Sequence, residues 1–367
     1  MAIAEITTQR DMRLTNSQMS TAKTCLRKHY LAYELGIRRD EEAKPLRMGS
    51  AVHLGLDLRA KGQDMQSVLN AVNGEYAQQA PAPTSDAYTD WAVEAMTVQT
   101  LLQLYGWRWA EQDESIEYVA SELSFEIPIV NPDSGRAKRT HTLAGKIDKI
   151  VKLSDGRLAI MEHKTTSWDI APESDYWRRL RIDSQISIYF MAAQALGYDV
   201  QCILYDVIRK PSLRLKQVEE LDEQGDKIVL DSDGTRIYLA NGKPRQSADT
   251  AKGWVVLKRM ETPVEFGARL HTEIVGNHEK YFQRQEITRL AADIEDAKYE
   301  NHQMASLIHD CQRHGRWPRN TQACIGFGKC AYFDLCANSF DPFNAGSGPL
   351  PAGYTRVQNV HQELDES

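Results

Sequence analysis

The chain carries two carboxylates and a lysine whose types and spacing suit phosphodiester hydrolysis. Residues 145–150 read Gly-Lys-Ile-Asp-Lys-Ile and residues 160–165 read Ile-Met-Glu-His-Lys-Thr, so the candidates are Asp148, Glu162 and Lys164. Neighbouring carboxylates repel each other unless a cation lies between them, and Mg²⁺ is a hard ion that prefers oxygen ligands. Such an ion lowers the pKa of a bound water, while a lysine can orient that water or neutralise charge on the phosphate. Magnesium-assisted hydrolysis is therefore the reaction that this trio fits best.

Whether the two acids meet depends on the turn between their segments. Ser154-Asp155-Gly156 predicts a three-residue hairpin loop with Gly156 in the left-handed conformation. In that register Asp148 lies opposite Glu162, and Lys164 shares their face of the sheet. A loop of two or four residues would put the acids on opposite faces. Taken alone, the trio also fits a surface hairpin that bears ordinary charges.

The segments around these residues alternate between strand and helix patterns. Apolar residues at every second position over 123–129 predict a strand. We expect further strands over 140–153, 158–164 and 200–208, and helices over 16–36, from about 48, and over 88–112, 178–197 and 264–312. This order predicts an α/β fold in which helices flank a mixed central sheet.

Five parts follow one another along the chain. An N-terminal helical part (1–115) contains Cys25 and His53, and the core that carries the candidate acids is expected over 116–218. An inserted hairpin or loop (219–253) leads to C-terminal helices and a cysteine cluster (254–340). The last part (341–367) has little apolar content, which predicts a disordered tail. No internal repeat is apparent.

The bulk composition is that of a soluble globular protein. Of 367 residues, 42% are hydrophobic and 26% are charged. The net charge of −7 argues against a protein that coats nucleic acid non-specifically, but it permits an enzyme with a local basic groove. The absence of a long apolar run and of signal-peptide features leads us to expect no membrane contact and a cytoplasmic location.

Two further motifs complete a pattern. Residues 46–57 read Leu-Arg-Met-Gly-Ser-Ala-Val-His-Leu-Gly-Leu-Asp, and residues 185–189 read Gln-Ile-Ser-Ile-Tyr. Together with the two acidic segments, they resemble the RecB-like branch of the PD-(D/E)XK nucleases, which includes CRISPR-associated RecB-like exonucleases, AddB and many phage exonucleases. The resemblance runs from Ser17 to Cys336, apart from about 219–253, and it implies a restriction-endonuclease-like core.

The resemblance implies a role for each motif residue. His53, Asp148 and Glu162 would be metal ligands, and Asp148, Glu162 and Lys164 would be the catalytic residues. Gln185 and Tyr189, four positions apart on one helical face, would contact DNA near the site. Without the resemblance, a surface position for His53 and a core position for Tyr189 are the simpler interpretations.

The implied activity is that of a deoxyribonuclease that depends on Mg²⁺ or Mn²⁺. We expect an exonuclease that acts on single-stranded DNA or duplex ends in recombination, repair or phage DNA processing. Besides DNA, its partners would be recombination, helicase, CRISPR or phage proteins. The alternative is a non-catalytic DNA-binding or assembly module on the same fold, but the full set of charged residues favours an enzyme.

Three cysteines, Cys324, Cys330 and Cys336, fall within 13 residues. In a cytoplasmic chain, clustered cysteines are more often metal ligands than disulfides. The segment resembles the C-terminal part of the iron–sulfur site in AddB and the CRISPR-associated nucleases, and Cys25 stands where their distant fourth ligand would be. The resemblance implies a 4Fe–4S cluster that joins the N- and C-terminal parts. The family spaces its last three cysteines differently, and zinc or an unmetallated set of thiols remains an alternative.

Overall fold

A computed structural model describes residues 12–40, 44–326, 328–338, 349–361 and 364. At its centre lies a six-stranded sheet with the order β1-β4-β5-β6-β11, in which β3 also pairs with β4. The strands are β1 (Arg13–Leu14), β3 (Glu117–Val130), β4 (Ala137–Lys152), β5 (Leu158–Thr166), β6 (Val200–Arg209) and β11 (Phe282–Ile287). The β1–β4 and β5–β6 pairs are parallel, and the other pairs are antiparallel. The expected mixed α/β sheet is confirmed.

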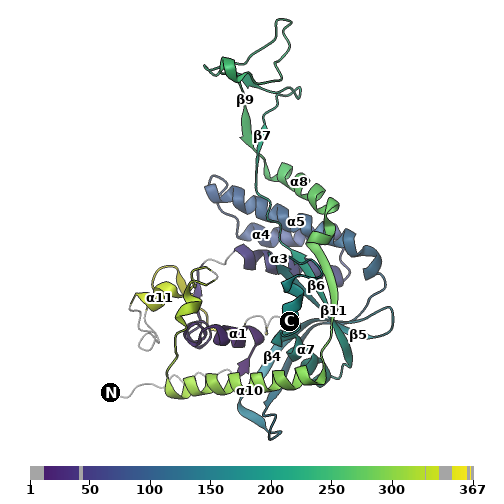
Figure 1. The fold of residues 1–367 in the computed structure, drawn as a ribbon, viewed down its shortest axis with the longest axis vertical. Coiled ribbons are helices and arrows are strands. Elements are labelled where there is room, and N and C mark those ends of the chain that lie inside the picture. Colours follow the sequence, from purple (N-terminus) through teal and green to yellow (C-terminus); the bar gives the residue numbers. More distant parts are fainter. Residues whose placement is uncertain (1–11, 41–43, 327, 339–348, 362–363, 365–367) are drawn as a thin grey trace.

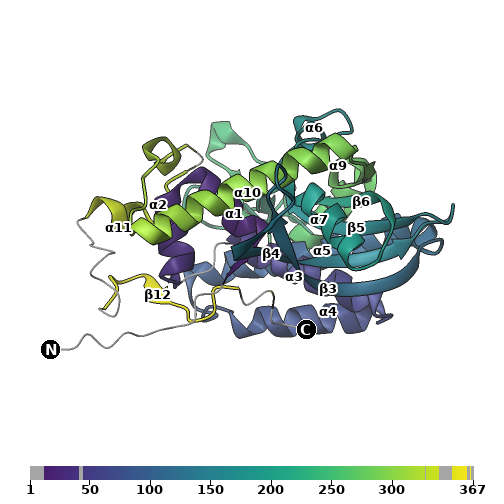
Figure 2. The same ribbon diagram turned by 90° about the horizontal axis from the view of Figure 1, so that it is seen from below.

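Helices cover both faces of this sheet (Figure 2). One face packs against α3 (Lys44–Ala60), α4 (Met65–Gln78), α5 (Asp86–Asp113) and α8 (Pro263–Gly276). The other face packs against α1 (Asn16–Thr24), α7 (Ser184–Ala195) and α10 (Ala291–His314). The shorter helices are α2 (Leu26–His29), α6 (Asp175–Leu180), α9 (His278–Tyr281) and α11 (Phe333–Ala337). No helix in the described part of the chain combines the length and apolarity needed to cross a membrane.

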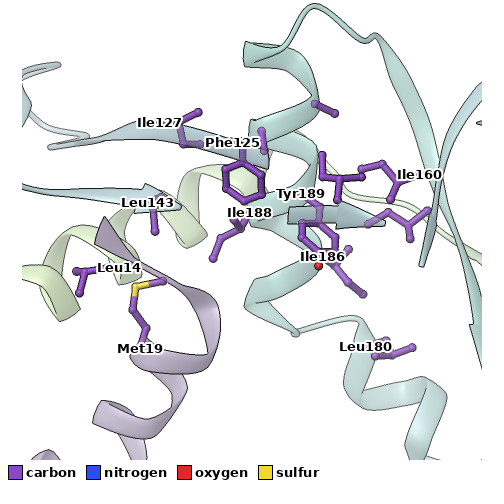
Figure 3. Packing of buried hydrophobic residues seen from close by; sticks show 14 of the residues in the cluster. Leu14, Met19, Phe125, Ile127, Leu143, Ile160, Leu180, Ile186, Ile188 and Tyr189 are labelled. Atoms are coloured by element: carbon purple, nitrogen blue, oxygen red, sulfur yellow. The ribbon is translucent and has the colours of Figure 1, made fainter. Parts of the chain in front are cut away.

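Tyr189, a candidate functional residue, packs in the hydrophobic core on the α7 face of the sheet (Figure 3). Phe125 of β3 lies opposite Gly145 of β4, and its ring meets the Tyr189 ring edge-on at a centroid distance of 6.4 Å. A Cβ atom at position 145 would lie 2.5 Å from Phe125 Cζ. The glycine of the 145–150 motif therefore leaves the space in which Phe125 packs against Tyr189.

Four expectations from the sequence are wrong in part, and one of them is the helix expected over 178–197, which is divided into α6 and α7. The helix expected over 16–36 is broken at Cys25, whose backbone is extended (φ −164°, ψ 116°). The helical stretch expected over 264–312 is interrupted by β11, which completes the sheet although it lies outside 116–218. In the tail that was expected to be disordered, β12 (Tyr354–Arg356) pairs with β2 (Ile37–Arg39) because the edge of β2 offers unpaired backbone groups. Residues 339–348, 362–363 and 365–367 lie outside the described part.

The insertion forms an arm that projects from the body (Figure 1). At its base β7 (Gln217–Glu219) pairs with β10 (Lys258–Met260), and further out β8 (Val229–Leu230) pairs with β9 (Val255–Val256). Three similar turns, each with a glycine at positive φ, follow one another at Gly225, Gly234 and Gly242. Their sequences share a leucine three or four positions before the glycine, so the expectation of no internal repeat is wrong for this segment.

Candidate active site

The hairpin between β4 and β5 has the register that the sequence predicts. Lys149 pairs with Met161 and Ile150 with Ile160, and Gly156 has a φ of 87°. The pairing ends at Lys149–Met161, so Asp148 and Glu162 are the next residues on the two strands. From there β4 goes on to pair with β1 at Thr142 and Leu143, whereas β5 continues beside β6. The candidate acids therefore lie where the two strands begin to separate.

Asp148 is held from two sides. Its Oδ2 accepts a hydrogen bond from the backbone N–H of His163 at 3.2 Å, and His53 Nδ1 lies 3.9 Å from the same oxygen. Helix α3 brings His53 there because Gly49 lies against β5: a Cβ at position 49 would be 3.4 Å from Thr165 Oγ1. The structure thus brings His53 and Asp148 together, as the motif order implies.

Glu162 is almost completely buried, with 1% of its surface exposed. Its Oε1 pairs with Lys164 and accepts a hydrogen bond from the Tyr189 hydroxyl at 3.5 Å, while Oε2 has no partner among the described residues. Burial and, after it, the charge of Asp148 raise the pKa of Glu162 to about 8, although Lys164 and Tyr189 act in the opposite direction. A cation between the acids would take the place of that proton.

Lys164 keeps its charge at this site. Burial disfavours the ammonium form, but Glu162, Tyr189 and Asp148 outweigh burial and raise the pKa of Lys164. Its side chain is 31% exposed, so it can reach a bound phosphate as well as Glu162. A permanently charged lysine beside two acids is suited to stabilise negative charge that develops on a reacting group.

Gln185 and Tyr189 lie on α7 and face the acids rather than solvent. Gln185 Nε2 donates to the Tyr189 hydroxyl at 2.8 Å, and that hydroxyl donates to Glu162. Tyr189 is 6% exposed, as its core position implies. In this structure the pair orients Glu162, and a contact with DNA stays a prediction.

A row of buried polar residues, which the sequence motifs do not predict, crosses three strands on the α5 face. His163 of β5 lies beside Asp206 of β6, and Asp206 lies beside Arg284 of β11. The Tyr105 hydroxyl of α5 donates to Asp206 Oδ2 at 2.6 Å and lies 3.2 Å from His163 Nε2. Arg284 donates to Asp206 Oδ2 from Nε at 2.9 Å and from Nη2 at 2.6 Å. The sequence signal was an aspartate inside the apolar strand 203–208.

Replacing Asp206 by alanine should destabilise the fold by about 2–4 kcal/mol, because it removes the buried carboxylate that accepts from both Tyr105 and Arg284, while Asp113 still pairs with Arg284 at 2.9 Å. Asp206 is fully buried and the Arg284 side chain is 7% exposed. Urea unfolding monitored by circular dichroism measures the loss. The matched control is Asp226→Ala in the projecting arm, which should change the free energy of unfolding by less than about 1 kcal/mol. Equal stability of Asp206→Ala and the wild type would contradict the ion-pair argument.

The donor set of the site suits a hard divalent cation. Asp148 and Glu162 offer carboxylate oxygens, one of which is buried without a partner, and His53 offers a nitrogen. Within the described residues, however, no three His, Cys, Asp or Glu side chains are already grouped as a metal shell. A cation would thus have to draw Asp148 and Glu162 together.

The predicted cysteine ligands come from the segments that the sequence analysis named. Cys25 lies between α1 and α2, and Cys324 ends a short 3₁₀ turn, Thr321–Cys324. Asn320 lies between them: its N–H donates to Cys25 Sγ at 3.4 Å, and Cys324 Sγ donates to its carbonyl oxygen at 3.8 Å. The Cys330 N–H donates to the Cys324 carbonyl oxygen at 2.8 Å.

The electrostatics of these thiols are mixed. Cys25, Cys324, Cys330 and Cys336 are all half-buried and free of disulfides. Burial raises the pKa of Cys336, whereas Arg319 and Arg27 favour its thiolate. One N–H···S hydrogen bond and two nearby arginines are compatible with thiolate ligation, but the four thiols are not grouped as a metal shell in the described part of the chain. Cys202 is buried in β6, as expected for a core thiol.

Comparisons with known proteins identify the family of this chain. The model of the PD-(D/E)XK nuclease superfamily matches residues 13–337. One subunit of the ATP-dependent helicase/deoxyribonuclease of Streptococcus equi subsp. zooepidemicus (strain MGCS10565) is 24% identical over 230 residues. That match covers 59% of this chain but only 20% of the streptococcal protein. The solved structure of SSO0001 matches at 12% identity over 71% of this chain and 85% of that chain, but its TM-score of 0.20 is too low to support an argument. With the family model matching most of its length, this chain belongs to the PD-(D/E)XK nuclease superfamily.

Proposed function

We propose that this protein is a DNA nuclease that depends on Mg²⁺ or Mn²⁺, with its reaction centre at Asp148, Glu162 and Lys164. The observation that supports it best is the buried Glu162 carboxylate, which has one oxygen without a partner and faces Asp148 beside a charged lysine. A divalent cation would replace the proton on Glu162, and it would supply the charge that activates water and stabilises a five-coordinate phosphate. Asp148, Glu162 and His53 would hold it.

The other residues of the site have roles that follow from their contacts. The backbone N–H of His163 fixes the Asp148 carboxylate, and Tyr189 with Gln185 fixes Glu162. Lys164 would orient the attacking water or stabilise the phosphate in the transition state. None of these groups is consumed in the reaction, as catalysis of hydrolysis requires.

The test is an assay of end-labelled single-stranded and double-stranded DNA with Mg²⁺, with Mn²⁺ and with EDTA. We expect cleavage with either metal and none with EDTA, and products that shorten from an end in the manner of an exonuclease. A single-stranded or frayed end is the proposed substrate. DNA binding without cleavage under every metal condition would favour the alternative, a DNA-binding or assembly module.

Lys164→Ala should lower turnover by about 10²–10³-fold while DNA and metal still bind, because the lysine acts mainly on the transition state. Single-turnover kinetics at saturating enzyme measures the chemical step, and fluorescence anisotropy measures DNA binding. Lys152→Ala, a half-exposed lysine at the far end of β4, is the control and should cleave normally. If Lys164→Ala lost DNA binding and kept the rate of the chemical step, Lys164 would be a phosphate anchor instead.

We also propose a metal site made by Cys25, Cys324, Cys330 and Cys336, with a 4Fe–4S cluster as the first candidate and zinc as the second. The support is the approach of N- and C-terminal thiols around Asn320 and the arginines beside them. Iron and zinc content per chain, measured after anaerobic purification, distinguishes the two metals.

Partner proteins follow only from analogy. The streptococcal relative is named as part of a helicase/deoxyribonuclease, and a helicase is the partner that we propose on that basis. Co-purification with a tagged copy of this chain tests that proposal.

A further inference from the structure

We propose that Trp168, held in place by Arg179, is a stacking platform for an unpaired base of the substrate strand. This proposal rests on the proposed function and deepens it, because it assigns the residue that would bind the unpaired part of the substrate strand beside the reaction centre. The observation behind the proposal is the exposure of Trp168. This tryptophan follows the end of β5 by two residues, and 52% of its surface is exposed.

Trp168 lies close to the candidate acids. One face of β5 carries the side chains at every second position, Glu162, Lys164 and Thr166. Trp168 follows two residues later, and its backbone N–H donates to Thr166 Oγ1 at 3.1 Å. At about 3.3 Å per residue, the Cα of Trp168 lies within about 13 Å of the Cα of Lys164. A strand whose scissile phosphate lies at Lys164 therefore has neighbouring bases within reach of the indole.

The Arg179 side chain holds the indole of Trp168 in place. The Arg179 guanidinium lies over the Trp168 ring at 5.4 Å from its centroid and over the Tyr176 ring at 5.1 Å. Tyr176 is buried, and its hydroxyl interacts with Tyr205, which pairs with Glu162 across β5 and β6. A chain of contacts thus joins Trp168 to the reaction centre.

No packing role accounts for Trp168. It belongs to none of the hydrophobic clusters of the described residues, although a tryptophan contributes most to stability when it is buried. A preorganised aromatic face at low entropic cost is instead what base stacking requires.

The surface beside Trp168 suits a nucleic-acid backbone. Arg178, Arg179 and Arg181 are all exposed on or next to α6. Arg178 pairs with Asp175 at 3.5 Å, but both side chains are largely in water, so a phosphate can replace that partner at little cost. Arginines interleaved with an aromatic ring are typical of single-strand binding surfaces.

The stacking geometry selects for unpaired DNA. In a duplex, each base is already stacked on both sides, and its face is closed to a protein ring. A base reaches Trp168 only where the strand is single or has frayed. The platform would therefore confer a preference for unpaired ends without any contact to base edges.

The test measures binding of fluorescent oligo(dT) and of a blunt duplex by anisotropy, with Ca²⁺ in place of Mg²⁺. Trp168→Ala should weaken oligo(dT) binding by about tenfold, Trp168→Phe should retain most of it, and duplex affinity should not change. Trp107→Ala is the matched control, because Trp107 is also 52% exposed but lies on α5 and packs edge-on against His278. It should bind both ligands as the wild type does.

A double-mutant cycle sharpens the result. A single abasic residue is moved along the oligonucleotide, and at one position it should weaken binding to the wild type but not to Trp168→Ala. The proposal is overturned if no position couples to Trp168, if oligo(dT) affinity is unchanged, or if Trp168→Ala weakens duplex and single strand equally. These binding measurements need no cleavage. Coupling between Trp168 and one abasic position without any DNA hydrolysis would contradict the proposed function alone, and hydrolysis without that coupling would contradict the stacking platform alone.

Discussion

Glu162→Gln is expected to abolish cleavage, by about 10³-fold or more, while the protein stays folded. The substitution keeps the shape of the side chain and an oxygen that accepts from Tyr189, but it removes the charge on which cation binding depends. It also removes a charge that burial and, after it, Asp148 make unfavourable, the two effects that raise the pKa of Glu162 to about 8. Loss of activity would thus come without loss of stability.

The measurement pairs a cleavage assay with urea unfolding and with Mn²⁺ binding followed by calorimetry. Glu126→Gln is the matched control: this exposed glutamate of β3 accepts a hydrogen bond from Thr142 and lies outside the site. The control should cleave DNA and bind Mn²⁺ as the wild type does. Near wild-type cleavage by Glu162→Gln with Mg²⁺ would show that the reaction centre lies elsewhere.

The sequence predicts the reaction hairpin well because its determinants are local. The Ser154-Asp155-Gly156 turn sets the register, and the period of two then decides which side chains share a face. Glycine at position 156 has the positive φ that this turn requires. Asp148, Glu162 and Lys164 are placed by about 20 residues of continuous chain, so no long-range contact is needed to predict their approach.

The sequence predicts long-range features less well. Strand β11 reads as part of a helical stretch, because its polar residues Gln283, Arg284 and Gln285 hide a strand whose partners lie on β6. Its pairing depends on burying Arg284 against Asp206 and Tyr105, which are far apart in the sequence. The same holds for β12, whose partners, β2 and the Ala331 carbonyl oxygen, come from distant parts of the chain. Tertiary context overrides local propensity at such positions.

Tyr189 shows the intermediate case. Its spacing from Gln185 predicts a shared helical face, which the structure has. What that face points at depends on the Phe125 ring of β3 and on Gly145 of β4, both far from the helix in the sequence. The motif therefore identifies the residue, and the packing reveals that its hydroxyl meets Glu162.

Cys25→Ala is expected to remove both the metal and much of the stability of the fold. Cys25 and Cys324 are about 300 residues apart, and closing so long a loop through shared ligation would stabilise the native state by roughly 6 kcal/mol in the chain-entropy picture. Their approach through Asn320 is the structural basis for that expectation. The wild type should be brown, with a broad absorption near about 400 nm and about four irons per chain, and Cys25→Ala should be colourless and unfold at lower urea concentration.

Cys202→Ala is the control that distinguishes loss of a metal ligand from loss of any cysteine. Cys202 is fully buried in β6, away from the four predicted ligands, so its removal costs packing but should leave the colour and the iron content unchanged. One zinc per chain in a colourless wild type would replace the iron–sulfur cluster by the zinc alternative. A wild type that is folded and free of both metals would remove the site, and the short contacts around Asn320 would then be ordinary packing between the first helices and the C-terminal segment.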